Sequence, residues 1–159
     1  MTTVARPQQA AQSQRVESLR LLEHEVSVML RRIRRVLGER ARAVHPELQS
    51  GSYLMLAYLA DLGAMRASAI AEGLFLDKGA VSRQLQHLEE LGLVDRARDP
   101  EDGRATLVSA SEEAVRRIGQ VASERRRWLD DRLGDWSDDD LAHFAGQLGR
   151  YNASLDATE

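Results

Sequence analysis

The chain contains no cysteine, and this absence removes several kinds of chemistry. Without thiols there is no disulfide, no cysteine nucleophile, no iron–sulfur cluster, no cysteine zinc site and no thiol redox sensor. Long apolar runs are also missing: the run that starts at Tyr53 is interrupted at Asp61, whereas a bilayer span needs about 20 apolar residues. The first residues lack the apolar core of a secretion signal. We therefore expect a cytoplasmic protein without a membrane segment.

Proline is also absent from residues 15–43, where Gly38 is the one glycine. Apolar residues recur there at spacings of three, four and seven, which predicts one long amphipathic helix. They are Val16, Leu19, Val26, Leu30, Ile33 and Leu37. Further apolar residues broaden this surface beyond a single stripe, so we expect a second packing partner such as another subunit. Residues 1–14, rich in alanine and glutamine, are predicted to be a mobile tail.

Lysine is nearly absent as well, since Lys78 is the one lysine among 22 basic residues. The net charge is −3, so the overall composition gives no hint of nucleic acid. Net charge nevertheless does not forbid a local basic face. Arginine binds phosphates and guanine edges with a planar fork, although a GC-rich genome also favours arginine codons. The positions of the arginines must therefore decide what they do.

Turn and capping residues divide the next segment into helices. The residue before Pro46 is pushed out of the helical region, which ends the first helix. Ser50 or Ser52 is predicted to cap a second helix, and Gly63 to end it. The residues of this helix expected to point inward are Leu54, Tyr58 and Leu62.

A short helix over residues 67–73 is expected to precede a longer one that begins at Lys78 after an Asp77 cap and ends at Gly92. Its apolar face would hold Val81, Leu85, Leu88 and Leu91. The residues expected to face outward are Lys78, Ser82, Arg83, Gln86 and Glu89. Residues 93–98 and 105–109 alternate in polarity around a turn-rich segment, 99–103, which predicts a β-hairpin with a charged tip.

Two helices complete the chain. The first is predicted over residues 111–133, and Ser137 is predicted to cap the second, which begins with three acidic residues. The fold class is therefore mainly α with a small β-hairpin wing. The order of elements predicts a winged helix-turn-helix lobe over residues 46–110 and a helical dimerisation region over residues 15–45 and 111–155.

Four segments, residues 68–74, 77–83, 88–94 and 99–104, resemble the MarR family of bacterial transcriptional regulators. The last one contains the family's Asp-x-Arg wing signature as Asp102 and Arg104. This resemblance, over roughly residues 16–155, implies a homodimer with interlocked terminal helices. It also implies a pseudo-palindromic DNA operator and release by a small ligand or a similar signal. Two positions depart from the pattern: Gly79 replaces a small hydroxyl residue, and Arg66 provides no hydroxyl cap for the short helix.

A recognition helix enters the major groove with its N-terminal residues nearest the bases. Arg83 can fork onto guanine, and Gln84 or Gln86 onto adenine. By resemblance, Arg104 reaches the minor groove and Asp102 orients its guanidinium. The alternative for these two residues is an ordinary exposed ion pair. The complete set of expected DNA contacts is Lys78, Gly79, Ala80, Ser82, Arg83, Gln84, His87, Arg96, Arg98, Asp102 and Arg104.

Motifs for catalysis are missing, so we expect no enzyme and no cofactor. The four histidines are far apart in sequence and lack paired-ligand spacing, so we expect no metal, although carboxylates could join them at a zinc or manganese site. The sequence does not identify a ligand. Candidate residues for a ligand cleft, each of which could equally be core or interface, are Met29, Tyr53, Met55, Arg125 and Trp128.

The sequence thus predicts a sequence-specific transcriptional regulator, a repressor that binds double-stranded operator DNA as a homodimer. The alternative is a helical protein-interaction module with a winged fold that does not bind DNA. The acidic net charge of the chain favours this alternative. Residues 77–104 include seven acidic and five basic residues, so DNA affinity must come from the direction in which the charges face. The residues that oppose it are the outward Lys78, Ser82, Arg83 and Gln84 and the wing residue Arg104.

Overall fold

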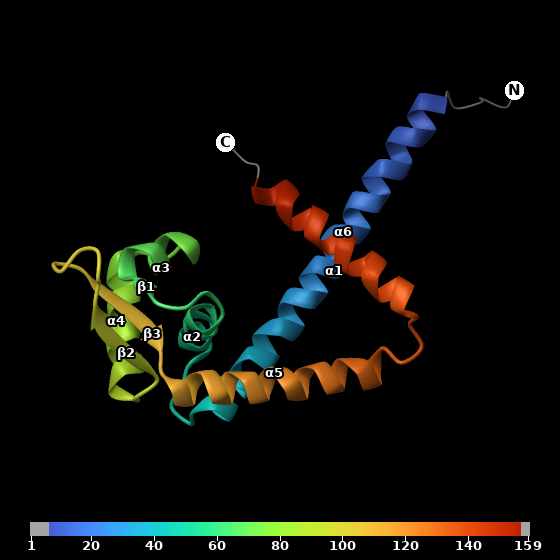
Figure 1. Cartoon of the computed structure of the whole chain (residues 1–159). Coiled ribbons are helices and arrows are strands. Elements are labelled where there is room, and N and C mark those ends of the chain that lie inside the picture. Colours follow the sequence, from blue (N-terminus) through green and yellow to red (C-terminus); the bar gives the residue numbers. More distant parts are fainter. Residues whose placement is uncertain (1–6, 157–159) are drawn as a thin grey trace, which may run out of the picture. The chain divides into compact units, whose positions relative to one another are not determined.

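The computed structural model describes residues 7–156. They form six helices and three short strands (Figure 1). The helices are α1 (Pro7–Val44), α2 (Ser50–Leu62), α3 (Ala67–Gly73), α4 (Lys78–Glu90), α5 (Glu112–Arg132) and α6 (Asp138–Asp156). The strands are β1 (Met65–Arg66), β2 (Val94–Arg98) and β3 (Thr106–Ala110). The chain divides into two compact units, Met1–Ile118 and Gly119–Glu159.

The three strands of the first unit form one antiparallel sheet in the order β1-β3-β2. The hairpin of β2 and β3 pairs Val94 with Ala110 and Arg98 with Thr106, as the alternating pattern predicts. Strand β1 adds to the other edge of β3, where Met65 lies opposite Val108. Strand β1 could not be predicted from the sequence, because two residues are too few to show an alternating pattern.

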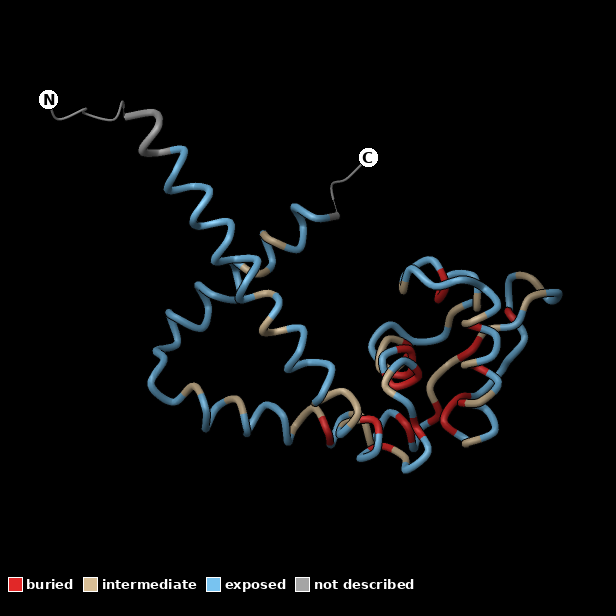
Figure 2. Tube along the Cα trace, turned by 180° about the vertical axis from the view of Figure 1, so that it is seen from behind, coloured by how far each residue is buried: buried red, intermediate tan, exposed pale blue. Residues whose placement is uncertain are grey.

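The hydrophobic core of the first unit lies where α2, α3 and α4 pack together with the sheet. Figure 2 shows most of the buried positions gathered in this winged lobe, whereas residues 12–35 of α1 are exposed or half-buried. The largest fully buried side chains are Val44, Met55, Leu56, Leu59, Ile70, Val81, Leu85, Leu88, Leu93 and Val108. Burying each of these side chains stabilises the fold by about 1.5–3 kcal/mol relative to leaving it exposed.

Polar caps fix the ends of several helices as the sequence predicts. The Asp77 carboxylate accepts a hydrogen bond from the Ala80 N–H at 2.9 Å, which starts α4. The Ser111 hydroxyl accepts one from the Ala114 N–H at 3.2 Å and starts α5. At α6, Ser137 accepts from the Asp140 N–H while the Asp140 carboxylate accepts from the Ser137 N–H, both at 3.1 Å. This reciprocal pair is a capping box.

Three predictions about the first two helices are wrong. Helix α1 begins at Pro7 rather than at residue 15, while residues 1–6 of the predicted tail lie outside the described residues. Helix α2 begins after Gln49, whose side chain makes no capping bond. Leu54 and Leu62 are exposed rather than inward. Nearly every residue from 53 to 60 is apolar, so the pattern does not fix which side of α2 is buried.

The first turns of α5 are held to the end of α1 by a charged side chain. The Arg117 guanidinium donates to the Val44 carbonyl at 2.9 Å and to the Glu113 carboxylate at 2.6 Å. Hydrogen bonds from Arg116 and Arg117 lower the pKa of Glu113 to about 2. The contact therefore keeps its charges at neutral pH. Over residues 7–156, no helix has both the length and the apolar character needed to cross a bilayer.

Gly92 ends α4 in a left-handed conformation, with φ +68°. Its N–H bonds to the Glu89 carbonyl, and the Leu93 N–H bonds to the Leu88 carbonyl, both at 2.9 Å. These two bonds form a Schellman motif, in which glycine avoids the steric cost of a Cβ atom.

We expect Gly92→Ala to lower the free energy of unfolding by about 1–2 kcal/mol, the cost of a left-handed residue with a Cβ. An added Cβ would meet no atom within 4 Å, so the loss reflects backbone strain alone. Gly103→Ala, which also enters open space, serves as the control and is expected to change stability by less than about 0.5 kcal/mol. Urea unfolding at one fixed protein concentration measures both, and equal losses would contradict the role of Gly92.

Candidate nucleic-acid interface

Helix α4 separates its polar and apolar side chains cleanly. Val81, Leu85 and Leu88 are at most 1% exposed, so the opposite face of the helix is turned to solvent. That face holds the exposed side chains of Lys78, Ser82, Arg83, Gln86 and Glu89. Because residues three or four apart share one side of a helix, these side chains form a continuous polar surface. The expectation for α4 from the sequence is confirmed here.

The absence of a side chain at residue 79 makes room at the start of α4. A Cβ atom at Gly79 would lie 3.1 Å from the Asp77 carboxylate and 3.5 Å from a guanidinium nitrogen of Arg83. The Arg83 side chain therefore extends back toward the N-terminus of the helix and reaches the level of its first turn. This is the end of a recognition helix that comes nearest to the bases.

Gln84 is turned away from this polar surface. Its side-chain amide is 3.8–3.9 Å from the position of a Cβ on Gly51 of α2, and its Oε1 atom is buried without a hydrogen-bond partner. The reason is its position in the helix, three residues after Val81 and four before Leu88. The expected contact between Gln84 and adenine does not fit this orientation. Gln86, which is exposed and bonds to Glu90 at 3.2 Å, is the glutamine on the polar face.

The wing carries its three arginines in different settings. Arg96 on β2 pairs with Glu89 of α4 at 2.8 Å, which ties the hairpin to the helix. Arg98 and Arg104 are exposed, and within residues 12–155 neither guanidinium has an ion-pair partner. His87 is half-buried, with Nδ1 3.9 Å from the Glu90 carboxylate. Ala80, in the first turn of α4, is also half-buried. Two cationic side chains of the wing thus remain available to an anionic ligand.

The base of the wing is held by Arg66 of β1. Its Nε and Nη2 atoms donate to Asp99 Oδ2 at 2.8 and 2.6 Å, and Nη2 also lies 3.5 Å from the Asp102 carboxylate. The Arg104 backbone N–H, rather than its guanidinium, bonds to Asp102 at 3.2 Å. The predicted bracing of the Arg104 side chain by Asp102 is therefore not found. This role of Arg66 was not predicted from the sequence, because it depends on β1, which brings the residue beside the wing.

This ion pair is stable over the physiological pH range. Hydrogen bonds from the Glu101 backbone N–H and from Arg66 hold the pKa of the Asp99 carboxyl below its ordinary value of 3.8. The same contact with Asp99 raises the pKa of Arg66. Asp99 is also buried, and a charge-assisted hydrogen bond gains strength away from water. The Arg66–Asp99 contact thus fixes the direction in which the wing leaves the lobe.

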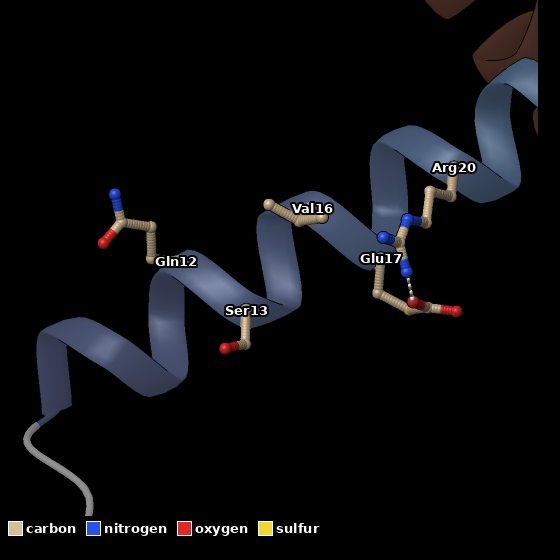
Figure 3. A pocket seen from close by; sticks show the side chains of 5 residues that line it. All are labelled: Gln12, Ser13, Val16, Glu17 and Arg20. Carbon is tan, nitrogen blue, oxygen red and sulfur yellow. Dashed lines mark ion pairs between the residues drawn. The ribbon is translucent and has the colours of Figure 1, made fainter.

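The candidate ligand residues are divided between the two units of the chain. Tyr53 and Met55 are buried in the core of the lobe and Met29 is half-buried, whereas Arg125 and Trp128 are exposed. One surface hollow is lined by Gln12, Ser13, Val16, Glu17 and Arg20, all from the single helix α1 (Figure 3). Among the side chains the structure describes, no three or more histidines or carboxylates are placed to hold a metal ion.

Comparison with known proteins agrees with this geometry. The sequence model of the MarR family matches residues 48–105, which contain α2, the helix-turn-helix and the first strand of the wing. The HTH-type transcriptional regulator YdgJ of Bacillus subtilis is 30% identical over 138 residues, covering 86% of this chain and 83% of the relative. The chain belongs to the MarR family. It is accordingly a winged helix-turn-helix transcriptional regulator and not an enzyme.

Solved structures of MarR-family proteins share the fold. The crystal structure of MarR superposes with a TM-score of 0.68 at 23% identity and covers 84% of this chain and 90% of that one. An Escherichia coli MarR mutant in complex with operator DNA gives a TM-score of 0.63 at 18% identity, covering 84% and 95%. The regulator YxaD of Bacillus subtilis is 29% identical over 135 residues, covering 85% of this chain and 93% of the relative.

The Arg66–Asp99 contact predicts how Asp99 titrates. Because its pKa lies below 3.8 in the folded state, the carboxylate stabilises the fold above this pH and loses that contribution as the pH falls toward the folded pKa. Arg66→Met is expected to raise the pKa of Asp99, but only in part, since the Glu101 N–H remains. NMR titration of the carboxyl carbon measures this shift. Arg98→Met, which removes an exposed arginine of β2, should leave the pKa unchanged; equal shifts in both variants would rule out a specific contact.

Proposed function

We propose that this MarR-family protein is a cytoplasmic repressor that binds a pseudo-palindromic DNA operator as a homodimer and is released by a small ligand. The observation that carries the proposal is the polar face of α4. Arg83 reaches toward the first turn of this helix, where Gly79 leaves room for it. A helix presented in this way fits the major groove of B-DNA, whose width admits one α-helix.

Each part of the surface has a defined role in this proposal. Arg83 forks onto the O6 and N7 atoms of guanine, and Gln86 or Ser82 bonds to a neighbouring base edge. Lys78 lies at the helix N-terminus, where partial positive charge favours phosphate. Arg98 and Arg104 on the wing reach the adjacent minor groove or its phosphates, and a narrow groove favours arginine. Base contacts then specify the sequence, while phosphate contacts fix the register.

The acidic residues of the lobe do not outweigh these cations. Asp99 and Asp102 lie beside Arg66, Glu89 pairs with Arg96, and Asp77 caps the N-terminus of α4. Each of these carboxylates is thus partly compensated by a nearby positive charge or helix dipole. The charge that faces DNA is therefore more positive than the count over residues 77–104 suggests. This arrangement favours DNA binding over a protein-interaction module that ignores DNA.

A second copy of the chain is the proposed partner of the long helices. In the first unit, α1 exposes the apolar side chains of Val16, Leu19, Leu21, Leu22, Leu30 and Ile33. In the second unit, Trp136 and Phe144 meet edge to face at 5.6 Å, and both remain more than 40% exposed. Exposed apolar surface of this extent is typical of an interface. A two-fold dimer would present two copies of α4 to two half-sites of a palindrome.

Repression and its release follow from this geometry. A dimer that occupies two successive half-sites within a promoter excludes other proteins from the same DNA. A ligand that changes the spacing of the two α4 helices would lower the affinity for the operator, because both half-sites must be contacted at once. The chemical class of this ligand is left open, since its candidate residues are divided between the two units.

The homodimer predicts a molecular mass of about twice 17.8 kDa in solution. We expect light scattering at low micromolar concentration to measure this mass. The interface of such a dimer is expected to bury more than about 2,000 Å². Leu19→Glu together with Leu22→Glu places charges on the apolar side of α1 and should shift the protein toward the monomer. Glu17→Gln on the same helix is the control. A monomeric wild type would contradict the dimer and the two half-sites that it implies.

Arg83 predicts how the protein reads its operator. We expect Arg83→Ala to weaken binding to the DNA upstream of the protein's own gene by ~1–3 kcal/mol and to relax the preference at one base pair of each half-site. Arg127→Ala, which removes an exposed arginine of α5, is the charge-matched control and should bind like the wild type. Fluorescence anisotropy with operator and scrambled duplexes measures the effect. An equal loss on both duplexes would make Arg83 a phosphate contact, and no binding by the wild type would favour the protein-interaction module.

A further inference from the structure

The turn between α3 and α4 contains the most exposed large apolar side chain that the structure describes. Phe75 is 93% exposed, and its φ of +53° makes it the one residue other than glycine with a positive φ between residues 7 and 156. Positive φ is uncommon for a residue with a Cβ and is unusual for a bulky aromatic one. Residues held in such regions tend to cluster at functional sites.

The backbone explains why residue 75 adopts this conformation. The Phe75 N–H bonds to the Glu72 carbonyl at 3.3 Å, and the Leu76 N–H bonds to the Ala71 carbonyl at 2.9 Å. This is the bond pattern of a Schellman motif, with Phe75 at the left-handed position that glycine usually occupies. Leu76 and Ala71 line the same surface hollow, in keeping with the apolar contact that accompanies the motif. The motif therefore fixes the backbone and directs the Phe75 side chain into solvent.

The end of α4 provides a comparison within the same lobe. There the same two hydrogen bonds surround Gly92, which has a φ of +68°. One Schellman motif thus uses glycine, and the other uses an exposed phenylalanine at the corresponding position. Phe75 adds no burial to the fold and carries a backbone strain that glycine would avoid. The stability of the monomer does not account for this residue.

The position of Phe75 relative to the recognition helix indicates a partner. It lies two residues before the Asp77 cap and three before Lys78, so its Cα is within about 11 Å of the Lys78 Cα along the chain. The N-terminal end of a recognition helix is the part that approaches the bases most closely. In the major groove, the apolar group that a phenylalanine can contact is the methyl group of thymine.

We propose that Phe75 is a specificity residue that packs against the 5-methyl group of a thymine at one position in each operator half-site. This inference rests on the proposed DNA-binding function and adds an apolar contact to the polar ones of Arg83 and Gln86. It assigns a preference for thymine at that position through its methyl group, which a hydrogen bond does not detect. Because the Schellman motif already fixes the backbone of Phe75, binding needs no further ordering of this backbone.

The test begins with selection of a binding site by the wild-type protein from a pool of random 24-base-pair duplexes. Thymines of the selected site are then replaced one at a time by uracil, which lacks only the methyl group. We expect one replacement per half-site to weaken wild-type binding about fourfold, because burying one such group contributes ~0.8 kcal/mol. Phe75→Gly should weaken binding to the unmodified site roughly tenfold and should no longer respond to uracil at that position.

Two controls separate this contact from a loss of structure. Phe75→Gly places the favoured residue at the left-handed position, so its unfolding midpoint in urea should not fall below that of the wild type. Leu62→Ala removes an exposed apolar side chain at the C-terminal end of α2 and should leave DNA affinity unchanged.

The possible outcomes distinguish this inference from the proposed function. If the wild-type protein selects no consensus site, the proposed function fails and the inference fails with it. If a site is selected but Phe75→Gly binds it with unchanged affinity, DNA binding stands and the role of Phe75 is refuted. If Phe75→Gly binds more weakly yet responds to uracil as the wild type does, the thymine contact is likewise refuted.

Discussion

The burial of Val81, Leu85 and Leu88 is the constraint on which the DNA-binding surface depends. These three side chains anchor α4 in the core of the lobe and so fix the rotation of the helix about its axis. A rotation by one residue, about 100°, would exchange part of the buried and exposed sets. With the rotation fixed, Arg83 and Gln86 face solvent while Gln84 faces α2. Hydrophobic packing thus decides which polar side chains can read DNA.

The wing depends on a different kind of interaction, a partly buried ion pair. The sheet places β3 between β1 and β2. Arg66 of β1 therefore comes within reach of Asp99 and Asp102, although 33 positions separate it from Asp99 in the sequence. Such a pair adds little to stability but specifies direction, because its hydrogen bonds are formed in one geometry. It also compensates two carboxylates that would otherwise repel phosphate. Arg66 therefore links the fold of the sheet to the electrostatics of the surface.

Local signals in the sequence were sufficient to predict α4, the hairpin and the caps of the later helices. The caps at Asp77, Gly92 and Ser137 each act within one turn of their own position, so their effects are visible without the tertiary fold. The residues of α4 predicted to face outward are also correct, because the apolar residues of this helix recur on one side only. These features, together with the motifs of the wing, were enough to predict the family and the fold.

Features that depend on tertiary contacts were not predictable in this way. The buried side of α2 depends on what packs against it, because its apolar residues surround the helix. Strand β1 exists through its pairing with β3, and the role of Arg66 follows from that pairing. Gln84 lies at the edge of the apolar stripe of α4, where the neighbouring helix decides between core and surface. The positive φ of Phe75 likewise depends on the hydrogen bonds of the whole turn. The residue type alone would predict a negative φ, because glycine usually occupies this position.

The distribution of apolar residues connects assembly to DNA recognition. The lobe encloses a core of fully buried side chains such as Met55, Leu56 and Leu85, whereas α1 exposes six large apolar side chains between residues 16 and 33. Propensity alone does not stabilise such an amphipathic helix well in water, and packing of its apolar face usually supplies the missing free energy. In the proposed dimer this packing comes from a second copy. The same contact would set the distance between two α4 helices, and this distance must match the helical repeat of DNA. Apolar surface far from the DNA would therefore determine the spacing of the half-sites, while the few exposed side chains of α4 and its preceding turn determine their sequence.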